Sequence, residues 1–231
     1  MSTAAVVQPR NIEPAKGVTT TTTATTPVVT LKRRTIDTVL IGFGAIATAV
    51  FGVAGGLLTW GHNFSSDYVR KELTSQNISF PAAAQLTTEG RPDLLSHAGQ
   101  RLSTGDGAQA YASYINGHLA KISPGATYAD LAAPETAAKA AVTAAAGQPA
   151  TQIAKLQASA DGITNTRNTL FKGETLRGLL LSAYAWSTVG TIAGIAAIGA
   201  FIAAGLMAIL VGLGIVHQRR TPKDVESLTS S

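Results

Sequence analysis

Two long uncharged stretches dominate the pattern of apolar and polar positions along this chain. The first runs from Thr38 to Trp60 and the second from Gly178 to Val216, and neither contains Asp, Glu, Lys or Arg. A helix of about 20 apolar residues is long enough to cross the hydrocarbon core of a bilayer. The pattern therefore predicts an all-α membrane protein, with two transmembrane helices and a mostly helical extracytoplasmic domain between them.

The flanks of the first stretch predict its orientation. Lys32, Arg33 and Arg34 precede it, whereas Trp60 ends it and Phe64 follows. Basic residues favour the cytoplasmic side of a membrane helix, and aromatic residues favour the interface. We expect residues 35–60 to form the first transmembrane helix with a cytoplasmic N-terminus. Polar residues come before an apolar run that is too long for a secretory signal peptide, which favours an uncleaved signal anchor.

The same stretch contains a weak match to a dinucleotide-binding motif. Gly42, Gly44 and Ala47 fit the spacing G-x-G-x-x-A. A Rossmann unit needs a helix with a polar outer face and an acidic residue about 20 positions further on. No charged residue occurs in the 16 positions after Ala47. A membrane helix is therefore the better interpretation.

The second stretch is too long for one crossing, because 39 helical residues would span about 58 Å. It also lacks the charged or Pro-containing turn that two crossings would need. Tyr184 and Trp186 predict an interfacial helix over residues 178–188, which continues into a second transmembrane helix over 189–216. Arg219 and Arg220 follow, so the tail of residues 217–231 is expected in the cytoplasm, together with a disordered, Thr-rich tail of residues 1–34.

Small residues at four-residue spacing predict that the two membrane helices pack together, because they let helix backbones approach closely in lipid. Chance matches are the alternative, since Gly and Ala are common throughout this chain. The candidate packing positions are Gly52, Gly56, Gly190, Gly194 and Gly199.

We expect residues 61–177 to form one extracytoplasmic helical domain. Their ten Lys and Arg against nine Asp and Glu give a net charge of +1, which gives no reason to expect nucleic acid as a partner. Apolar residues at three- and four-residue spacing predict a helix between Gly107 and Pro124. We also expect a helix from Ser65 or Ser66 to about residue 76, either separate from or continuous with the first apolar stretch, and a helix from Pro134 to about Gly147. A short helix from 151 to 160 is expected to end at Asp161 and Gly162, and a further one from 165 runs into the second apolar stretch with an interruption at Gly173. No segment alternates well enough to predict a strand.

The sequence offers little catalytic or metal-binding chemistry. It has no Cys, its four His residues are not paired, and neither apolar stretch contains a carboxylate for an ion pathway. Carboxylate pairs such as Asp93 with Asp106, or Asp130 with Glu135, lie among turn residues, where solvated side chains are expected. We therefore expect no catalytic residues, no metal and no cofactor, and an extracytoplasmic enzyme ranks last among the functions considered.

One segment is a candidate docking surface. Glu174, Arg177, Tyr184 and Trp186 belong to a polar and aromatic helix that emerges from the predicted membrane region. Such a helix can present a face to a partner. An interfacial anchor is the alternative of equal weight.

Four segments carry a resemblance to a known family: FSSDYVR from Phe64, NISFP from Asn77, AGQR from Ala98 and GETLRGLLLSAYAW from Gly173. From about Thr38 to Arg220 the chain resembles a family of actinobacterial two-span membrane proteins without an established activity. Some similar chains carry the label of an aromatic ring-opening dioxygenase. That activity needs an iron site of two His and a carboxylate, and this sequence contains no such cluster.

These observations favour an accessory or scaffold subunit of an envelope complex in the plasma membrane. The expected partners are membrane lipid and either another protein or further copies of the chain. The alternative is an extracytoplasmic sensor that signals through its two helices to a cytoplasmic partner.

Overall fold

The computed structural model describes residues 31–221 and 226–227. Of the Thr-rich tail expected to be disordered over residues 1–34, residues 1–30 lie outside the described residues, whereas residues 31–34 belong to β1 and the start of α1, which corrects that boundary. Most of the tail after Thr221 also lies outside the described residues. The elements follow in the order β1 (Leu31–Lys32), α1 (Arg33–Ser75), α2 (Ala83–Thr88), the 3-10 helix η1 (Pro92–His97), α3 (Gly105–Ile122), α4 (Ala132–Ala144), α5 (Ala150–Arg220) and β2 (Glu226–Ser227). The described chain is therefore mostly helical, as the sequence predicts. Its two short strands form an antiparallel pair.

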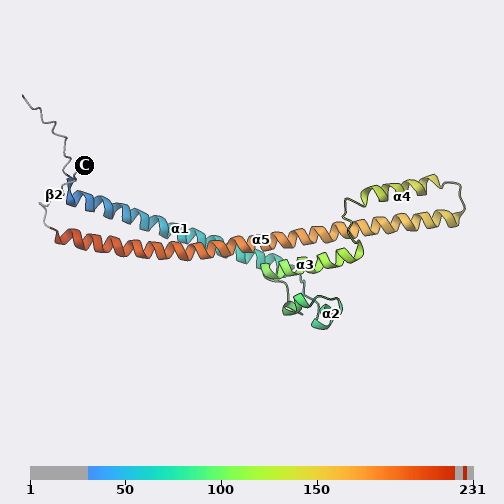
Figure 1. Cartoon of the computed structure of the whole chain (residues 1–231), viewed down its shortest axis with the longest axis horizontal. Coiled ribbons are helices and arrows are strands. Elements are labelled where there is room, and N and C mark those ends of the chain that lie inside the picture. Colours follow the sequence, from blue (N-terminus) through green and yellow to red (C-terminus); the bar gives the residue numbers. More distant parts are fainter. Residues whose placement is uncertain (1–30, 222–225, 228–231) are drawn as a thin grey trace, which may run out of the picture.

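Helix α5 is the longest helix, and the other long helices pack along it (Figure 1). Its 71 residues extend over about 107 Å. Helices α1, α3 and α4 lie along successive parts of it. Gly44 of α1 lies against Val211, Gly173 of α5 against Leu119 of α3, and Glu135 of α4 bonds Arg167. Each of these three helices thus packs against a different segment of α5.

The apolar parts of α1 and α5 lie side by side and expose most of their surface. Both helices are long and apolar enough to cross a membrane, and only 11% and 6% of their most apolar windows are buried. Phe43 is 70% exposed and Ile195 is 67% exposed. A helix in the core of a soluble protein would bury such side chains. These two helices instead present an apolar surface around their common axis.

The register between α1 and α5 is antiparallel and continuous. Gln218 Nε2 donates to Thr38 Oγ1 over 2.5 Å, and His62 Nδ1 contacts the Gly190 carbonyl oxygen at 2.7 Å, at the other end of the apolar contact. The first apolar stretch therefore lies beside residues of about 195–218. Residues 178–194 extend past it, beside the polar part of α1.

The segment between α1 and α3, which carries α2 and η1, forms with α3 a small domain where α1 ends, called the head below. Its main core joins side chains from α1, α3, α5 and the segment between α1 and α3: Val69, Leu73, Phe80, Leu102, Ala108, Ala112 and Leu180. A bridge between Ser79 and Arg101 closes the segment that carries α2 and η1. In a second buried cluster, α2 and η1 pack against α3 through Leu86, Leu94 and Tyr114. The head therefore depends on both long helices.

The structure confirms the helix predicted before Pro124. Helix α3 begins after Thr104, whose side chain accepts a hydrogen bond from the Gly107 N–H over 3.1 Å, as an N-cap residue does. Its buried stripe includes Ala108, Ala112 and Leu119. Helix α4 is also present, but it begins at Ala132, two residues before Pro134.

Two predicted helix interruptions are wrong, and one open alternative is decided. Ser65 does not cap a separate helix, because the helix up to Ser75 is continuous with the first apolar stretch in α1; the Ser65 hydroxyl donates to the Trp186 carbonyl oxygen over 2.5 Å. Helix α5 likewise passes through Asp161 and Gly162 without a break, and through Gly173. A helical Gly costs about 1 kcal/mol relative to Ala, which tertiary contacts can outweigh. At Gly173 the contact requires Gly, because a β-carbon would lie 2.5 Å from Leu119 Cδ2.

Candidate functional site

The contact between α1 and α5 includes two polar side chains near the head. His62 Nδ1 lies 2.7 Å from the Gly190 carbonyl oxygen, and the Ser65 hydroxyl bonds the Trp186 carbonyl oxygen. Because a carbonyl oxygen only accepts, Nδ1 of His62 carries the proton in this bond. Both bonds require close approach of the helices. A β-carbon at Gly190 would lie 2.9 Å from Ser65 Oγ, and one at Gly194 would lie 2.9 Å from His62 Nδ1.

The other three glycines predicted to pack between the helices do not do so. A β-carbon at Gly52, Gly56 or Gly199 would meet no atom within 4 Å in the described part of the chain. Successive residues of an α-helix are rotated by about 100° around the helix axis, so a position shifted by one or two residues faces a different side of the helix. A motif of small residues can therefore lie on a face that the partner helix does not touch.

Sequence reasoning missed the glycines that do lie at the contact. Gly44 lies against Val211, Gly55 against Phe201, and Gly214 against Ile41, where a β-carbon would come within 3.0 Å of the facing side chain. Among the α1 residues at the contact, 55, 62 and 69 are spaced by seven, and 41 and 44, like 62 and 65, are spaced by three, as expected for one face of a helix against an antiparallel partner. That seven-residue period, rather than the four-residue motif, was the informative signal.

Trp186 lines a groove between α1 and α5 just beyond the first apolar stretch. The groove has a volume of about 300 Å³, and Trp186 at its edge is half exposed. Its walls are mainly apolar, with Glu72, Gln76 and Ser182 as polar members. Tyr68 also borders it and stacks on Phe64, whose ring in turn stacks on Trp60. An exposed ladder of aromatic rings thus leads from the apolar part of α1 to the groove.

The four residues of the candidate docking surface do not form one surface. The Tyr184 backbone lies beside α3, where its Cα would be 3.5 Å from a β-carbon at Gly105, and Tyr184 does not line the groove. Glu174 and Arg177 form an exposed ion pair one turn apart, with Oε2 and Nη1 separated by 3.0 Å. Neither lines the groove. Of these four residues, the structure therefore brings only Trp186 together with residues of α1 in the groove.

Glu135 forms the anchor of α4 on α5. Its Oε1 accepts from Lys139 Nζ over 2.5 Å and from the Thr164 hydroxyl over 3.0 Å, and its Oε2 accepts from Arg167 Nη1 over 2.7 Å. Hydrogen bonds from Lys139, Arg167 and Thr164 lower the pKa of the Glu135 carboxyl to about 2. Arg167 also lies over the Tyr128 ring, 4.1 Å from its centroid. The expectation of a solvated carboxylate is therefore wrong for Glu135, which is 7% exposed.

A second polar cluster lies where α2 meets α3. Glu89 Oε1 accepts from Gln85 Nε2 over 2.9 Å, and Glu89 Oε2 lies 3.4 Å from His118 Nε2. The hydrogen bond from Gln85 is the main cause of a lowered pKa for Glu89. Burial and Glu89 raise the pKa of Tyr114, whose ring packs edge-on against His118, to about 12. The Glu89 carbonyl oxygen also accepts from Lys121 Nζ, so this cluster holds the α2 segment on α3.

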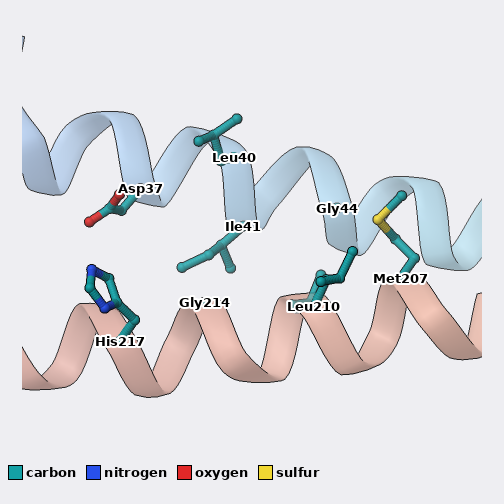
Figure 2. A pocket seen from close by; sticks show the side chains of 9 residues that line it. Asp37, Leu40, Ile41, Gly44, Met207, Leu210, Gly214 and His217 are labelled. Carbon is teal, nitrogen blue, oxygen red and sulfur yellow. The ribbon is translucent and has the colours of Figure 1, made fainter.

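A cleft between α1 and α5 opens at the opposite end of their contact (Figure 2). It has a volume of about 220 Å³. Asp37 and His217 stand at its mouth and point toward one another. Asp37 Oδ2 is buried and has no hydrogen-bond partner among the described residues. Asp37 belongs to no motif in the sequence, and its position between the basic triplet and the apolar stretch is the one signal that distinguishes it.

The histidines occupy four separate places, and His97 stacks on Phe80 in the head. Residues 31–221 contain no group of three His, Asp or Glu side chains that could hold a metal ion. Comparison with protein-family models, with curated proteins and with solved structures found no match. The resemblance to actinobacterial two-span membrane proteins therefore stays a prediction.

Proposed function

We propose that this chain is a plasma-membrane protein with two antiparallel transmembrane helices, formed by the apolar parts of α1 and α5. The support is the exposure of these parts, because a large apolar surface around a helix pair is stable in lipid and costly in water. The basic residues Arg33, Arg34, Arg219 and Arg220 gather at one end of the pair, which favours cytoplasmic termini. The head, α4 and most of the remaining α5 would then be extracytoplasmic.

The absence of Cys from the sequence makes this topology easy to test. Single Cys substitutions at Ser159 of α5 and at Thr221 after it would place one thiol on each side. A membrane-impermeant maleimide should label Ser159→Cys in intact cells, and should label Thr221→Cys only after the membrane is opened. Labelling of both variants in intact cells, or recovery of the chain in the soluble fraction, would contradict the topology.

Within that membrane, the function we propose is that of an accessory or scaffold subunit. The observation that carries the proposal is the continuity of α5. Residues 150–194 extend about 68 Å beyond the part that pairs with the first apolar stretch. Helix α3 and the Glu135 anchor of α4 stiffen this arm. A rigid arm holds a docking surface at a fixed distance from the bilayer, which is what an assembly subunit requires.

The test is purification of the tagged full chain from native membranes in mild detergent, followed by mass spectrometry. We expect a stoichiometric protein partner whose retention depends on Trp186, since exposed aromatic side chains beside a groove often dominate binding energy. Trp186→Ala should lose the partner. Trp60→Ala, the same change at an exposed Trp outside the groove, should keep it. A chain that purifies alone would refute the accessory-subunit proposal.

The sensor function remains a second proposal because both long helices enter the core of the head. Val69 and Leu73 of α1 share that core with Leu180 of α5. A ligand that moved the head would therefore displace both membrane helices. Deletion of residues 1–30 and 222–231 should then abolish signalling to a cytoplasmic partner, and an unchanged response would refute the sensor proposal.

A further inference from the structure

The cleft at the Asp37 end of the helix pair combines an apolar floor with a polar mouth (Figure 2). Side chains of both helices form the floor: Leu40, Ile41, Met207, Leu210 and Val211, together with the backbone at Gly44 and Gly214. A volume of about 220 Å³ corresponds to roughly seven groups of the size of a water molecule. The floor therefore suits part of a hydrocarbon chain.

Asp37 gives the mouth a specific chemical requirement. A buried carboxylate oxygen without a donor loses its hydration and gains nothing in return. His217 faces Asp37 across the mouth, but among the described residues no hydrogen bond reaches Asp37 Oδ2. A neutral imidazole has one N–H donor and one acceptor nitrogen. The unpaired carboxylate oxygen, beside an imidazole that can accept at one nitrogen, favours a ligand group that carries several N–H donors, and the negative charge of Asp37 favours a cation.

Arginines flank the same mouth one turn further out. Arg33 precedes Asp37 by four residues, and Arg220 follows His217 by three, so each lies on the same side of its helix as the mouth. Both residues are exposed. Arg side chains pair well with phosphate groups, because their N–H donors form a planar fork. The mouth thus offers a site for a cation beside a site for a phosphate.

We propose that this cleft binds a bilayer phospholipid whose head group carries a primary ammonium next to its phosphate, as an ethanolamine phospholipid does. The ammonium donates to Asp37 and His217, the phosphate lies between Arg33 and Arg220, and one acyl chain enters the floor. Only two carbon atoms separate the ammonium from the phosphate in such a head group, so both can be bound together. This inference rests on the proposed membrane location.

The test compares three phospholipids with identical acyl chains: phosphatidylethanolamine, phosphatidylcholine and phosphatidylglycerol. Each is titrated onto the detergent-purified full chain, and retained lipid is counted by native mass spectrometry. A choline head group has no N–H donor, and a glycerol head group has no positive charge. We expect phosphatidylethanolamine to bind about 10- to 100-fold more tightly than the other two, which is the range for hydrogen bonds to a charged group.

Two variants test whether Asp37 is the source of the preference for phosphatidylethanolamine. Asp37→Asn should remove the preference for phosphatidylethanolamine and leave the binding of phosphatidylcholine unchanged. Asp67→Asn is the matched control, because Asp67 is an exposed carboxylate on the same helix that pairs with Arg70. It should retain the full preference. Circular dichroism of each variant checks that the helices are intact.

Equal binding of the three lipids by the unmodified chain would overturn the inference, and that measurement needs no variant. A preference that survives in Asp37→Asn would also overturn it, since the ammonium site would then lie elsewhere. These failures differ from failure of the membrane proposal. In that case the maleimide labelling would contradict the topology, whereas labelling that supports it together with indiscriminate lipid binding would overturn only the lipid site.

Discussion

Replacing Gly194 by Ala should weaken the pairing of α1 with α5. A β-carbon at this position would lie 2.9 Å from His62 Nδ1 and 3.1 Å from its Cγ. The imidazole cannot move freely, because Nδ1 bonds the Gly190 carbonyl oxygen at 2.7 Å. The added methyl group must therefore displace the ring, lengthen this hydrogen bond, or separate the helices.

The magnitude follows from a comparison with Gly199→Ala. Both changes replace a helical Gly of α5, so each gains about 1 kcal/mol of helix propensity. A β-carbon at Gly199 meets nothing within 4 Å among the described residues, so that variant should be more stable than the unmodified chain. At Gly194, overpacking costs about 1–3 kcal/mol and the weakened hydrogen bond about 0.5–1.5 kcal/mol. The two variants should therefore differ by about 1.5–4.5 kcal/mol.

The assay is reversible unfolding of the detergent-solubilised chain with increasing sodium dodecyl sulfate, followed by tryptophan fluorescence. Trp186 is a suitable reporter, because its carbonyl oxygen accepts a hydrogen bond from Ser65 across the helix pair. The same comparison in a His62→Ala background forms a double-mutant cycle. Without the imidazole, Gly194→Ala and Gly199→Ala should have equal effects. If the two variants were already equally stable with His62 present, the close approach of the helices at Gly194 would be refuted.

Three further predictions concern α3, α4 and the part of α5 that they contact. The pKa of Glu135 is lowered from 4.5 to about 2, so its bonds stabilise the folded chain above about pH 4.5 and are lost as the pH falls toward 2; spin labels on α4 and α5 should separate over that range, and Glu135→Gln should remove this dependence. Arg167→Lys should lower stability by about 0.5–1 kcal/mol in thermal unfolding, through loss of stacking on Tyr128, and an unchanged midpoint would contradict this. Gly173→Ala gains about 1 kcal/mol of helix propensity and loses about 1–3 kcal/mol to overpacking against Leu119, so it should cost up to about 2 kcal/mol in the same assay but stabilise the chain in a Leu119→Ala background, whereas a single variant stabilised by the full 1 kcal/mol or so would disprove the contact.

The sequence predicted those parts of the fold that depend on local pattern. The two apolar stretches and α3 are long and periodic, so their helical state follows from composition and spacing alone. The break predicted at Gly162 failed because Gly and Asp indicate a turn only when nothing else holds the helix. Here Thr164 and Arg167, directly after that position, bond Glu135 of α4. That contact joins residues about 30 positions apart, so no pattern in the sequence around Gly162 indicates it.

The candidate sites were harder to predict than the helices, because they depend on which face of one helix meets another. Gly194 and Gly199 look equivalent in the sequence, yet only Gly194 faces α1. Trp186 lines the groove between α1 and α5, whereas the backbone of Tyr184, two residues before it, lies beside Gly105 of α3. Asp37 became a candidate only when the antiparallel register placed it opposite His217. The register fixes these pairings, and it is a tertiary property.

The unbroken length of α5 makes it a lever. In the proposed orientation, a bilayer that becomes thinner or thicker changes the tilt of the membrane helices, which is how such helices accommodate a mismatch in length. With no hinge between the membrane part and residue 150, the far end must follow. A tilt of about 10° moves the tip of a 68 Å arm by about 12 Å. A small change in the lipid around the chain would thus become a displacement, far from the bilayer, that is as wide as a helix.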